Sequence, residues 1–278
     1  RRHTRSFHVT GVQTCALPIW KQVRYIDQIR VEIDLENGAR LSSVQWGGYE
    51  FSVQKRENIL HWGWYPMIPW AGRVLHGKFR HSDGREEQLP TNIIPPHAIH
   101  GLGFQMPWRD CGNGVSRVDF PAPYNGASAE LRVSVEGNVL NYELEYFAGE
   151  CDLPGWAGIH TWFPREIGGG AEKAEVIFDA EKMLKVDETL MPNGEFISPI
   201  TAQPWDDVFH TPIGTPTTLW RGGAKLEVTS PTPWWVVYTL DSEGVCIEPQ
   251  TAPPNAQNLG YDLSKSNLLQ AKFTFSKA

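Results

Sequence analysis

The chain has 278 residues, of which 41% are hydrophobic, and carries a formal net charge of −7 at pH 7. This acidic balance argues against nucleic acid or an anionic membrane surface as a partner. No apolar run approaches the roughly 20 residues needed to span a bilayer. The composition therefore predicts a globular protein with no nucleic-acid and no membrane partner, and it carries no signal of oligomeric state.

Residues 1–19 resemble a translated sequencing adapter rather than evolved protein, above all in the run Val9-Thr10-Gly11-Val12-Gln13-Thr14-Cys15-Ala16-Leu17-Pro18-Ile19. They lack the continuous apolar stretch and the cleavage site of a signal peptide. We therefore expect residues 1–19 to be a non-native segment and the natural chain to begin near Trp20, with its true start missing. Without the three arginines of this segment, 22 basic residues face 32 acidic ones.

Period-two alternation of apolar and polar residues dominates the rest of the chain and predicts half-buried strands. Residues 29–35 and 39–46 flank Glu36-Asn37-Gly38, in which Asn-Gly favours a tight hairpin. Two further alternating stretches, 130–136 and 140–146, are joined by a turn at Gly137-Asn138, and residues 269–275 form one face of a closing strand. Helix signals are almost absent. We predict an all-β fold, a large antiparallel β-sandwich, as a single domain over residues 20–278.

Cysteines are few once Cys15 is set aside: Cys111, Cys151 and Cys246 remain, with no Cys-x-x-Cys pair. There is also no Asn-x-Ser/Thr acceptor for glycosylation. Both observations favour a reduced, cytoplasmic location.

Sequence motifs for phosphate binding and for metal binding are matched only in part. The segment Gly72-Arg73-Val74-Leu75-His76-Gly77-Lys78 fits the spacing of a phosphate-binding loop, but Phe79 stands where Ser or Thr should bind magnesium. His97 and His100 are three residues apart, without a carboxylate or cysteine cluster beside them. We therefore predict no metal site and no cofactor.

Glu248 is the strongest candidate for chemistry, because it ends the apolar stretch Val245-Cys246-Ile247 and precedes Pro249, which biases it to an extended backbone. A carboxylate at the end of an apolar strand needs contact with solvent, a charged or hydrogen-bonding partner, or a functional role. His160, in Gly158-Ile159-His160-Thr161-Trp162-Phe163, and His100, in Ala98-Ile99-His100-Gly101-Leu102, stand in similar settings. One carboxylate and two imidazoles suit proton transfer near neutral pH, although a solvated strand end and a satisfied core histidine explain the same residues.

Three further residues are candidates for binding a ligand. Arg73 lies among apolar residues, where a guanidinium usually needs an oxygen-rich partner. Trp162 offers an aromatic face of the kind that packs against sugar rings. Asp206 and Asp207 are adjacent acids before Val208-Phe209, more typical of loops than of catalysis taken alone.

In these residues the chain resembles the aldose 1-epimerase (galactose mutarotase) family, from Ile29 to the end. The blocks that carry the resemblance are Met67-Ile68-Pro69-Trp70-Ala71-Gly72-Arg73 with Gly77-Lys78-Phe79, Leu89-Pro90, Ala98-Ile99-His100-Gly101-Leu102, Gly158-Ile159-His160-Thr161-Trp162-Phe163, Asp206-Asp207-Val208-Phe209, and Glu248-Pro249-Gln250-Thr251 with Pro253-Pro254.

The resemblance implies a β-supersandwich whose open cleft binds a free sugar and interconverts its α and β anomers without a cofactor. It implies that His160 donates a proton to the ring oxygen and that Glu248 takes the proton of the C1 hydroxyl. His100 then assists at the ring oxygen, while Arg73 and Asp206 hold sugar hydroxyls, with Asp207 as the alternative aspartate. Acid and base must act together in ring opening, and each typically contributes about 10²–10⁴-fold.

The sequence departs from the family pattern in ways that leave other readings open. The Arg73 block lacks the second arginine of the usual Gly-Arg-x-x-Asn-Arg, having Gly72-Arg73-Val74-Leu75-His76 instead, and Thr161-Trp162 stands where Pro-Tyr is common. His160-Thr161 is similar to the related glucose-6-phosphate 1-epimerases, for which His76, Lys78 and Arg80 offer cations. A non-catalytic carbohydrate-binding protein on the same fold and a two-carboxylate glycosidase are further alternatives. A free hexose or similar aldose is the substrate that we expect.

Overall fold

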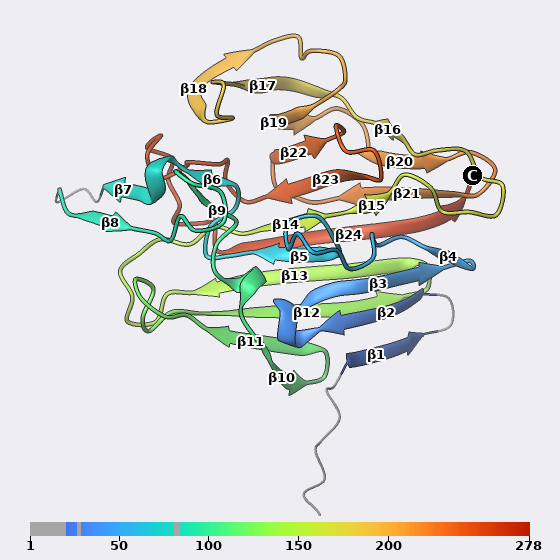
Figure 1. The fold of residues 1–278 in the computed structure, drawn as a ribbon, viewed down its shortest axis with the longest axis horizontal. Coiled ribbons are helices and arrows are strands. Elements are labelled where there is room, and N and C mark those ends of the chain that lie inside the picture. Colours follow the sequence, from blue (N-terminus) through green and yellow to red (C-terminus); the bar gives the residue numbers. More distant parts are fainter. Residues whose placement is uncertain (1–20, 27–28, 81–83) are drawn as a thin grey trace, which may run out of the picture.

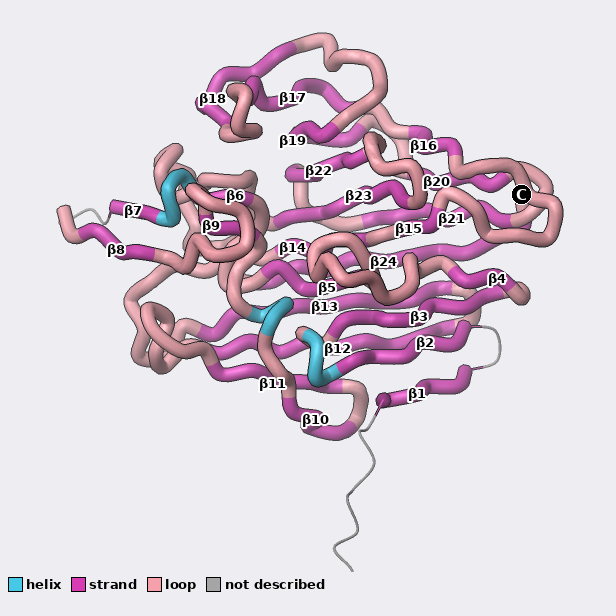
Figure 2. Tube along the Cα trace, in the orientation of Figure 1, coloured by secondary structure: helices cyan, strands magenta, loops and turns pink. Residues whose placement is uncertain are grey.

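A computed structural model describes residues 21–26, 29–80 and 84–278 (Figure 1). The expected non-native segment 1–19 and the expected start at Trp20 lie outside the described residues. The regular secondary structure of the described chain consists of strands, apart from three single-turn 3₁₀ helices (Figure 2). These helices are η1 (Leu35–Asn37), η2 (Leu75–Gly77) and η3 (Gly103–Gln105).

Twelve of the described strands form the larger sheet, in the order β1-β2-β3-β5-β14-β23-β22-β19-β17-β18, with β4 paired to β3 and β15 to β23. Their bounds are β1 (Lys21–Ile26), β2 (Ile29–Asp34), β3 (Arg40–Trp46), β4 (Tyr49–Glu50), β5 (Trp64–Met67), β14 (Gly158–Thr161), β15 (Phe163–Pro164), β17 (Ala180–Val186), β18 (Pro192–Ile197), β19 (Asp206–Pro212), β22 (Trp234–Tyr238) and β23 (Gly244–Gln250).

The smaller sheet has eight strands in the described chain, in the order β10-β11-β12-β13-β24-β21-β20-β16. They are β10 (Arg109–Gly112), β11 (Val115–Asp119), β12 (Ser128–Glu136), β13 (Val139–Phe147), β16 (Glu175–Ile177), β20 (Thr217–Trp220), β21 (Ala224–Thr229) and β24 (Leu268–Lys277). Two short ribbons pair β6 (Arg73–Val74) with β9 (Ala98–Ile99) and β7 (Lys78–Arg80) with β8 (Glu86–Gln88).

Every ladder between two of these strands is antiparallel, which confirms the predicted all-β, antiparallel class. The hairpin of β12 and β13 turns at Gly137-Asn138 as the alternation predicts, with Gly137 at a φ of 60°. Alternate residues of both strands are buried.

The hairpin of β2 and β3 pairs as predicted, but its connection is longer than the tight turn expected from Asn-Gly. The chain makes the 3₁₀ turn η1 there, and Asn37 Nδ2 donates a hydrogen bond to Asp34 Oδ2 at 2.9 Å. Gly38 follows with a φ of 84° and packs so closely that a Cβ would overlap the Phe104 backbone. Tertiary contact, which the dipeptide does not encode, therefore sets this turn.

The hydrophobic core lies between the two sheets and is rich in aromatic rings. Phe273 of β24 contacts Trp64 of β5 at a centroid distance of 4.7 Å and Phe163 of β15 at 6.5 Å. Phe275 packs on Phe51 at 5.0 Å. The predicted face of the closing strand is thus buried against the larger sheet.

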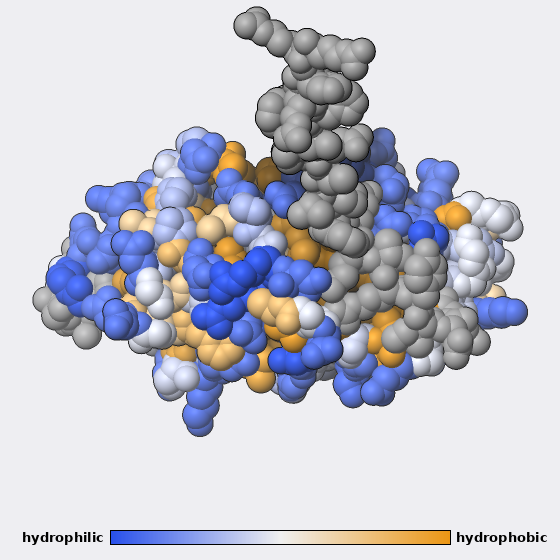
Figure 3. All heavy atoms as spheres, turned by 90° about the horizontal axis from the view of Figure 1, so that it is seen from below, coloured by the Kyte–Doolittle hydropathy of each residue, from blue (hydrophilic) through white to orange (hydrophobic). Residues whose placement is uncertain are grey.

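The surface mixes polar and apolar residues, and the face seen from below shows no large apolar area among its coloured atoms (Figure 3). Large hydrophobic side chains that are exposed in the described chain are scattered over several elements: Leu75, Ile177, Phe196, Ile213, Leu240 and Leu268. None of the described helices is long and apolar enough to cross a membrane.

Candidate active site

The site begins as a row of side chains across neighbouring strands of the larger sheet. His160 of β14 pairs with Tyr65 of β5, and the pairing of Gly158 with Gln250 sets Glu248 of β23 opposite His160. Val236 of β22 lies opposite Glu248 on the far side. Antiparallel register thus brings together an imidazole and a carboxyl that are 88 positions apart in the sequence.

Strand alternation turns this row away from the smaller sheet. Side chains of successive strand residues point to opposite faces. Because Trp64 and Phe163 pack on Phe273 in the core, Tyr65 and His160 lie on the other face of the larger sheet. That face is hollowed into a pocket lined by all six candidate residues: Arg73, His100, His160, Trp162, Asp206 and Glu248.

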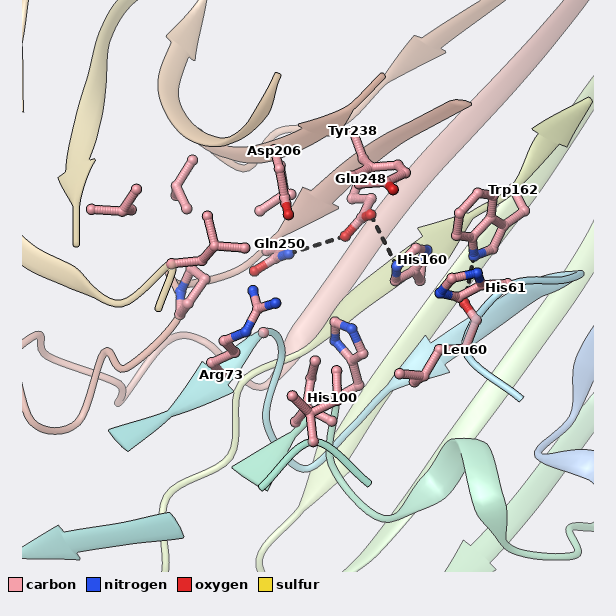
Figure 4. Close-up of a pocket in the computed structure, with 18 residues that line it drawn as sticks. Leu60, His61, Arg73, His100, His160, Trp162, Asp206, Tyr238, Glu248 and Gln250 are labelled. Atoms are coloured by element: carbon pink, nitrogen blue, oxygen red, sulfur yellow. Dashed lines mark hydrogen bonds and ion pairs between the residues drawn. The ribbon is translucent and has the colours of Figure 1, made fainter. Parts of the chain in front are cut away.

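His160 and Glu248 form a close, buried pair. The Nε2 atom of His160 lies 3.3 Å from Oε1 of Glu248, and the two side chains are only 11% and 2% exposed (Figure 4). Gln250, two residues along β23 and therefore on the same face, donates from Nε2 to Oε2 of Glu248 at 3.4 Å. One carboxyl oxygen thus faces the imidazole and the other faces an amide.

The surroundings favour the uncharged form of both partners. Burial lowers the pKa of His160 well below its ordinary value, and the nearby His100, Arg40, His61 and Arg73 lower it further. Burial also raises the pKa of Glu248 well above its usual range, helped by the charge of Asp206. The pair therefore has no net charge and holds one proton that either residue can carry.

His100 closes the pocket from the other side. Its backbone N–H donates to Gly72 O at 2.9 Å, and its ring lies 5.0 Å from the His160 ring, nearly perpendicular to it. Its Nδ1 is buried and has no hydrogen-bond partner within the described chain. Burial, with a contribution from Arg73, lowers the pKa of His100 to about 3, so it is a neutral imidazole.

Arg73 of β6 and Asp206 of β19 reach into the pocket from opposite sides (Figure 4). Neither side chain has a hydrogen bond or an ion pair within the described chain, so both keep their polar atoms for a ligand. Burial raises the pKa of Asp206, and the charge of Arg73 opposes that shift. Asp207 faces away and does not line the pocket, so of the two adjacent acids it is Asp206 that lies at the site.

Trp162 lines the pocket but is only 2% exposed. Its ring is nearly parallel to that of His160 at 5.5 Å and also packs on His61 at 5.2 Å. Its Nε1 donates to Leu60 O at 2.6 Å. These contacts fix the indole beside His160, and contact with a sugar ring stays a prediction.

Three polar residues of the pocket were not candidates from the sequence: His61, Tyr238 and Gln250. Gln250 had a usable signal, since it lies two residues from Glu248 on one strand face. Tyr238 had a weaker one, as an aromatic residue at the end of an apolar run. His61 lies in a loop that only the tertiary fold brings to the pocket.

The cations considered for phosphate binding lie elsewhere, because neither His76 nor Lys78 lines the pocket. The Arg80 side chain is outside the described part of the structure. Among the described residues, no third ligand joins His97 and His100, which the sequence had already indicated to be unsuited to a metal.

A different trio, His160, Cys246 and Glu248, has its ligand atoms within 4.8 Å of one another. A metal needs thiolate and carboxylate ligands, whereas burial raises the pKa of both Cys246 and Glu248. These residues suit a metal poorly in the protonation states that their surroundings favour.

Comparison with known proteins identifies the class. The family model described as aldose 1-epimerase matches residues 31–270, so the chain belongs to the aldose 1-epimerase family. This family membership confirms the resemblance read from the sequence blocks.

Individual relatives are distant. The uncharacterized protein YihR of Escherichia coli K12 is 27% identical over 233 residues, covering 71% of this chain and 72% of YihR. Among solved structures, a proposed aldose 1-epimerase of Escherichia coli K12 has a TM-score of 0.76 at 14% identity, covering 92% of this chain and 98% of the other. The GalM/aldose epimerase homologue of Caenorhabditis elegans has a TM-score of 0.69 at 18% identity, covering 90% and 96%. At these sequence identities the structural similarity shows the fold alone.

Proposed function

We propose that the protein is an aldose 1-epimerase, a mutarotase that interconverts the α and β anomers of a free hexose or similar aldose. The observation that carries the proposal is the buried pair of His160 and Glu248, 3.3 Å apart and without net charge, at one pocket with two unpartnered groups, Arg73 and Asp206. A pure binding site needs hydroxyl partners but no coupled acid and base.

During ring opening the pair of His160 and Glu248 takes up one proton from the sugar and gives one proton back to it. The transfers start from the form of the pair in which the shared proton is on His160. Glu248 is then a carboxylate and takes the proton of the C1 hydroxyl, so the O1–H bond breaks and C1=O1 forms. The C1–O5 bond then breaks, and His160 delivers a proton to O5. Rotation about C1–C2 presents the other carbonyl face, and the reverse transfers close the ring as the other anomer.

The electrostatics of the pair of His160 and Glu248 fit this order of proton transfers. Whether the shared proton is on His160 or on Glu248, the pair stays at zero net charge, and it remains so while one proton enters and another leaves. A buried site avoids the cost of isolating a charge by working in this way. The reaction as written moves only protons and the electron pairs of the breaking and forming bonds, and therefore requires no cofactor.

The remaining residues bind and orient the sugar. His100, as a neutral imidazole, holds a hydrogen bond near O5, while the guanidinium of Arg73 and the carboxylate of Asp206 bind ring hydroxyls. Trp162 keeps the His160 ring in place. The polar groups lie above an apolar floor of Val236 and Val208, which suits the C–H face of a pyranose.

A neutral substrate is favoured over a sugar phosphate because Arg73 is the only Lys or Arg among the described pocket residues. A dianionic phosphate would be expected to meet several charged donors. For the location, we keep the cytoplasm as the proposal, in line with the free Cys111, Cys151 and Cys246.

Exchange NMR at anomeric equilibrium tests the substrate class, because it measures α–β interconversion for each sugar without a fresh anomer. We expect enzyme-dependent exchange for glucose, galactose or a similar free aldose, little effect of salt, and an unchanged Michaelis constant in Lys78→Ala. Arg73→Lys, which loses the planar fork, should weaken binding. Faster exchange of glucose 6-phosphate than of every free sugar would overturn the neutral-substrate proposal.

A further inference from the structure

Arg40 is a fully buried arginine in the same cross-strand row as the candidate catalytic pair. Leu41 of β3 pairs with Trp64 of β5, which sets Arg40 opposite Tyr65, the residue that pairs with His160. The side chain of Arg40 is completely buried. The row therefore runs Arg40, Tyr65, His160, Glu248, with a guanidinium at one end and a carboxyl at the other.

No carboxylate forms an ion pair with Arg40 in the described part of the chain. Its Nε donates to Asn37 O at 3.4 Å, one terminal nitrogen donates to Trp62 O, and the other has no partner. An unpaired ion in a protein interior carries a desolvation cost of several kcal/mol. That burial lowers the pKa of Arg40 to about 10, which still leaves the guanidinium charged at neutral pH.

Aromatic rings take the place of a directly paired counter-ion, while the charge of Asp34 favours the guanidinium without forming an ion pair with it. The guanidinium carbon lies 4.2 Å from the centroid of the Trp62 ring and 4.3 Å from that of Tyr65. Cation–π contacts of this kind strengthen when both groups are desolvated. Tyr65 in turn packs nearly parallel to His160, with centroids 4.7 Å apart and ring planes 24° from parallel.

Arg40 also fixes the loop that borders the pocket. Its bond to Trp62 O and the bond from the Tyr65 hydroxyl to Leu60 O, at 3.1 Å, both hold residues 60–62. A Cβ on Gly63 would lie 2.5 Å from Cγ and Cδ of Arg40, so the loop packs directly on the arginine stem. Leu60 and His61 of this loop line the pocket.

We propose that Arg40 is a positioning residue of the catalytic site: it clamps the Tyr65 ring on which His160 packs, and it places a fixed positive charge behind that imidazole. This inference deepens the proposed function and rests on it, since the task of Arg40 is to hold His160 in the geometry that proton transfer needs and to make its imidazolium a stronger acid. Arg40 touches neither the pocket nor the substrate.

The charge effect has a definite sign. The groups that surround His160 are Glu248 and Cys246 from β23, Tyr65 from β5, His100 after β9, His61 from its loop, Arg73 from β6 and Arg40 from β3. A nearby cation disfavours the imidazolium. Removing the Arg40 charge should therefore raise the pKa of His160 and move the acid limb of the rate profile to higher pH.

Two substitutions separate charge from shape. Arg40→Met removes the charge and the planar fork, whereas Arg40→Lys keeps a charge and loses the fork. We expect Arg40→Met to lower kcat about 10-fold or more with a smaller change in KM, since Arg40 does not bind substrate. Arg40→Lys should lower kcat through the loosened Tyr65 ring and leave the pKa of His160 near the wild-type value. Arg165→Met is the matched control, because within the described chain the Arg165 side chain also donates only to backbone carbonyls, Asp241 O at 2.9 Å and Thr239 O at 2.5 Å.

Long-range ¹H–¹⁵N NMR of the imidazole nitrogens reads the His160 pKa directly, with the His160 signal assigned from its loss in His160→Gln. The inference predicts a higher pKa in Arg40→Met and no shift in Arg165→Met. An unchanged pKa together with unchanged kcat in folded Arg40→Met would overturn it. If Arg40→Met does not fold, a wild-type kcat in Arg40→Lys would contradict the proposal that Arg40 holds the Tyr65 ring in place. Because the NMR titration needs no turnover, it tests Arg40 even if no aldose proves to be a substrate, a result that would count against the proposed function alone.

Discussion

At the scale of single residues, burial disfavours the anionic form of the Glu248 carboxyl, and this suits the group to proton transfer. A carboxyl whose pKa lies well above its ordinary range accepts a proton readily near neutral pH. The imidazole opposite has the reverse shift and gives a proton up readily. The surroundings of the two side chains, more than their residue types, thus set the pKa values that suit them to proton transfer.

The pair should give a bell-shaped pH profile for kcat/KM. Activity requires one proton on the pair, so it falls as pH drops through the lowered pKa of His160 and as pH rises through the raised pKa of Glu248. We expect the acid limb to lie well below the ordinary histidine pKa of about 6.5. A profile with its acid limb at that ordinary value would indicate an unperturbed histidine and contradict the neutral pair.

Replacing Glu248 by glutamine should stabilise the fold increasingly as pH rises. The folded pKa of Glu248 is raised, so its contribution to stability is present at low pH and is lost as pH rises through the folded value. Glutamine stays neutral. Calorimetry of Glu248→Gln against wild type should show a difference in Tm that grows as pH rises above the ordinary carboxyl pKa of 4.5 and reaches a few degrees. A lower Tm at alkaline pH would mean that the carboxyl is stabilising as an anion.

At the scale of elements, the sequence was informative wherever local pattern decides the outcome. Alternation predicted β12, β13 and the buried face of β24, because burial of one sheet face imposes a period of two. The β2–β3 connection differed from its prediction because Gly38 packs against the Phe104 backbone, a contact distant in sequence. His61 and Arg40 were missed for the same reason: each acquires its place from a partner that no local pattern specifies.

The ribbon of β6 and β9 positions His100 through Gly101, which offers an element-scale prediction. Gly101 has a φ of 79°, and a Cβ there would overlap the carbonyl and backbone nitrogen of Ile68. Gly101→Ala should therefore destabilise the protein by about 1–3 kcal/mol and lower kcat/KM by displacing His100. Gly222→Ala is the control, since Gly222 has a similar φ of 76° but no atom of the described chain within 4 Å of the added Cβ. Equal effects of the two substitutions would assign the loss to backbone strain alone.

At the scale of the whole molecule, the pairing register of the strands brings the site residues together on one face of the larger sheet. The fold class was predictable from punctuated short strands, whereas the convergence of β5, β14 and β23 was not, because strand order is set by tertiary packing. Family blocks supplied His160 and Glu248 in advance, and the structure adds which of their atoms face each other.

Deleting residues 1–19 should leave the folded protein and its activity unchanged. The family match begins at residue 31, and the described residues of the core and of the pocket begin at Ile29 and Leu60, respectively. Thermal unfolding and anomer exchange of the truncated chain check this expectation. A Tm lowered by several degrees would show that the segment contributes to the fold.

Mutarotation of freshly dissolved α-galactose and α-glucose, followed by polarimetry, tests the central claim most directly. We predict a rate above that of buffer in proportion to the protein for at least one sugar, and a turnover lower by about 10²-fold or more in Glu248→Gln and in His160→Gln, with both variants folded and still binding the sugar. A wild-type rate equal to that of buffer, or full activity in either variant, would contradict the assignment of His160 and Glu248 as the catalytic pair of a mutarotase.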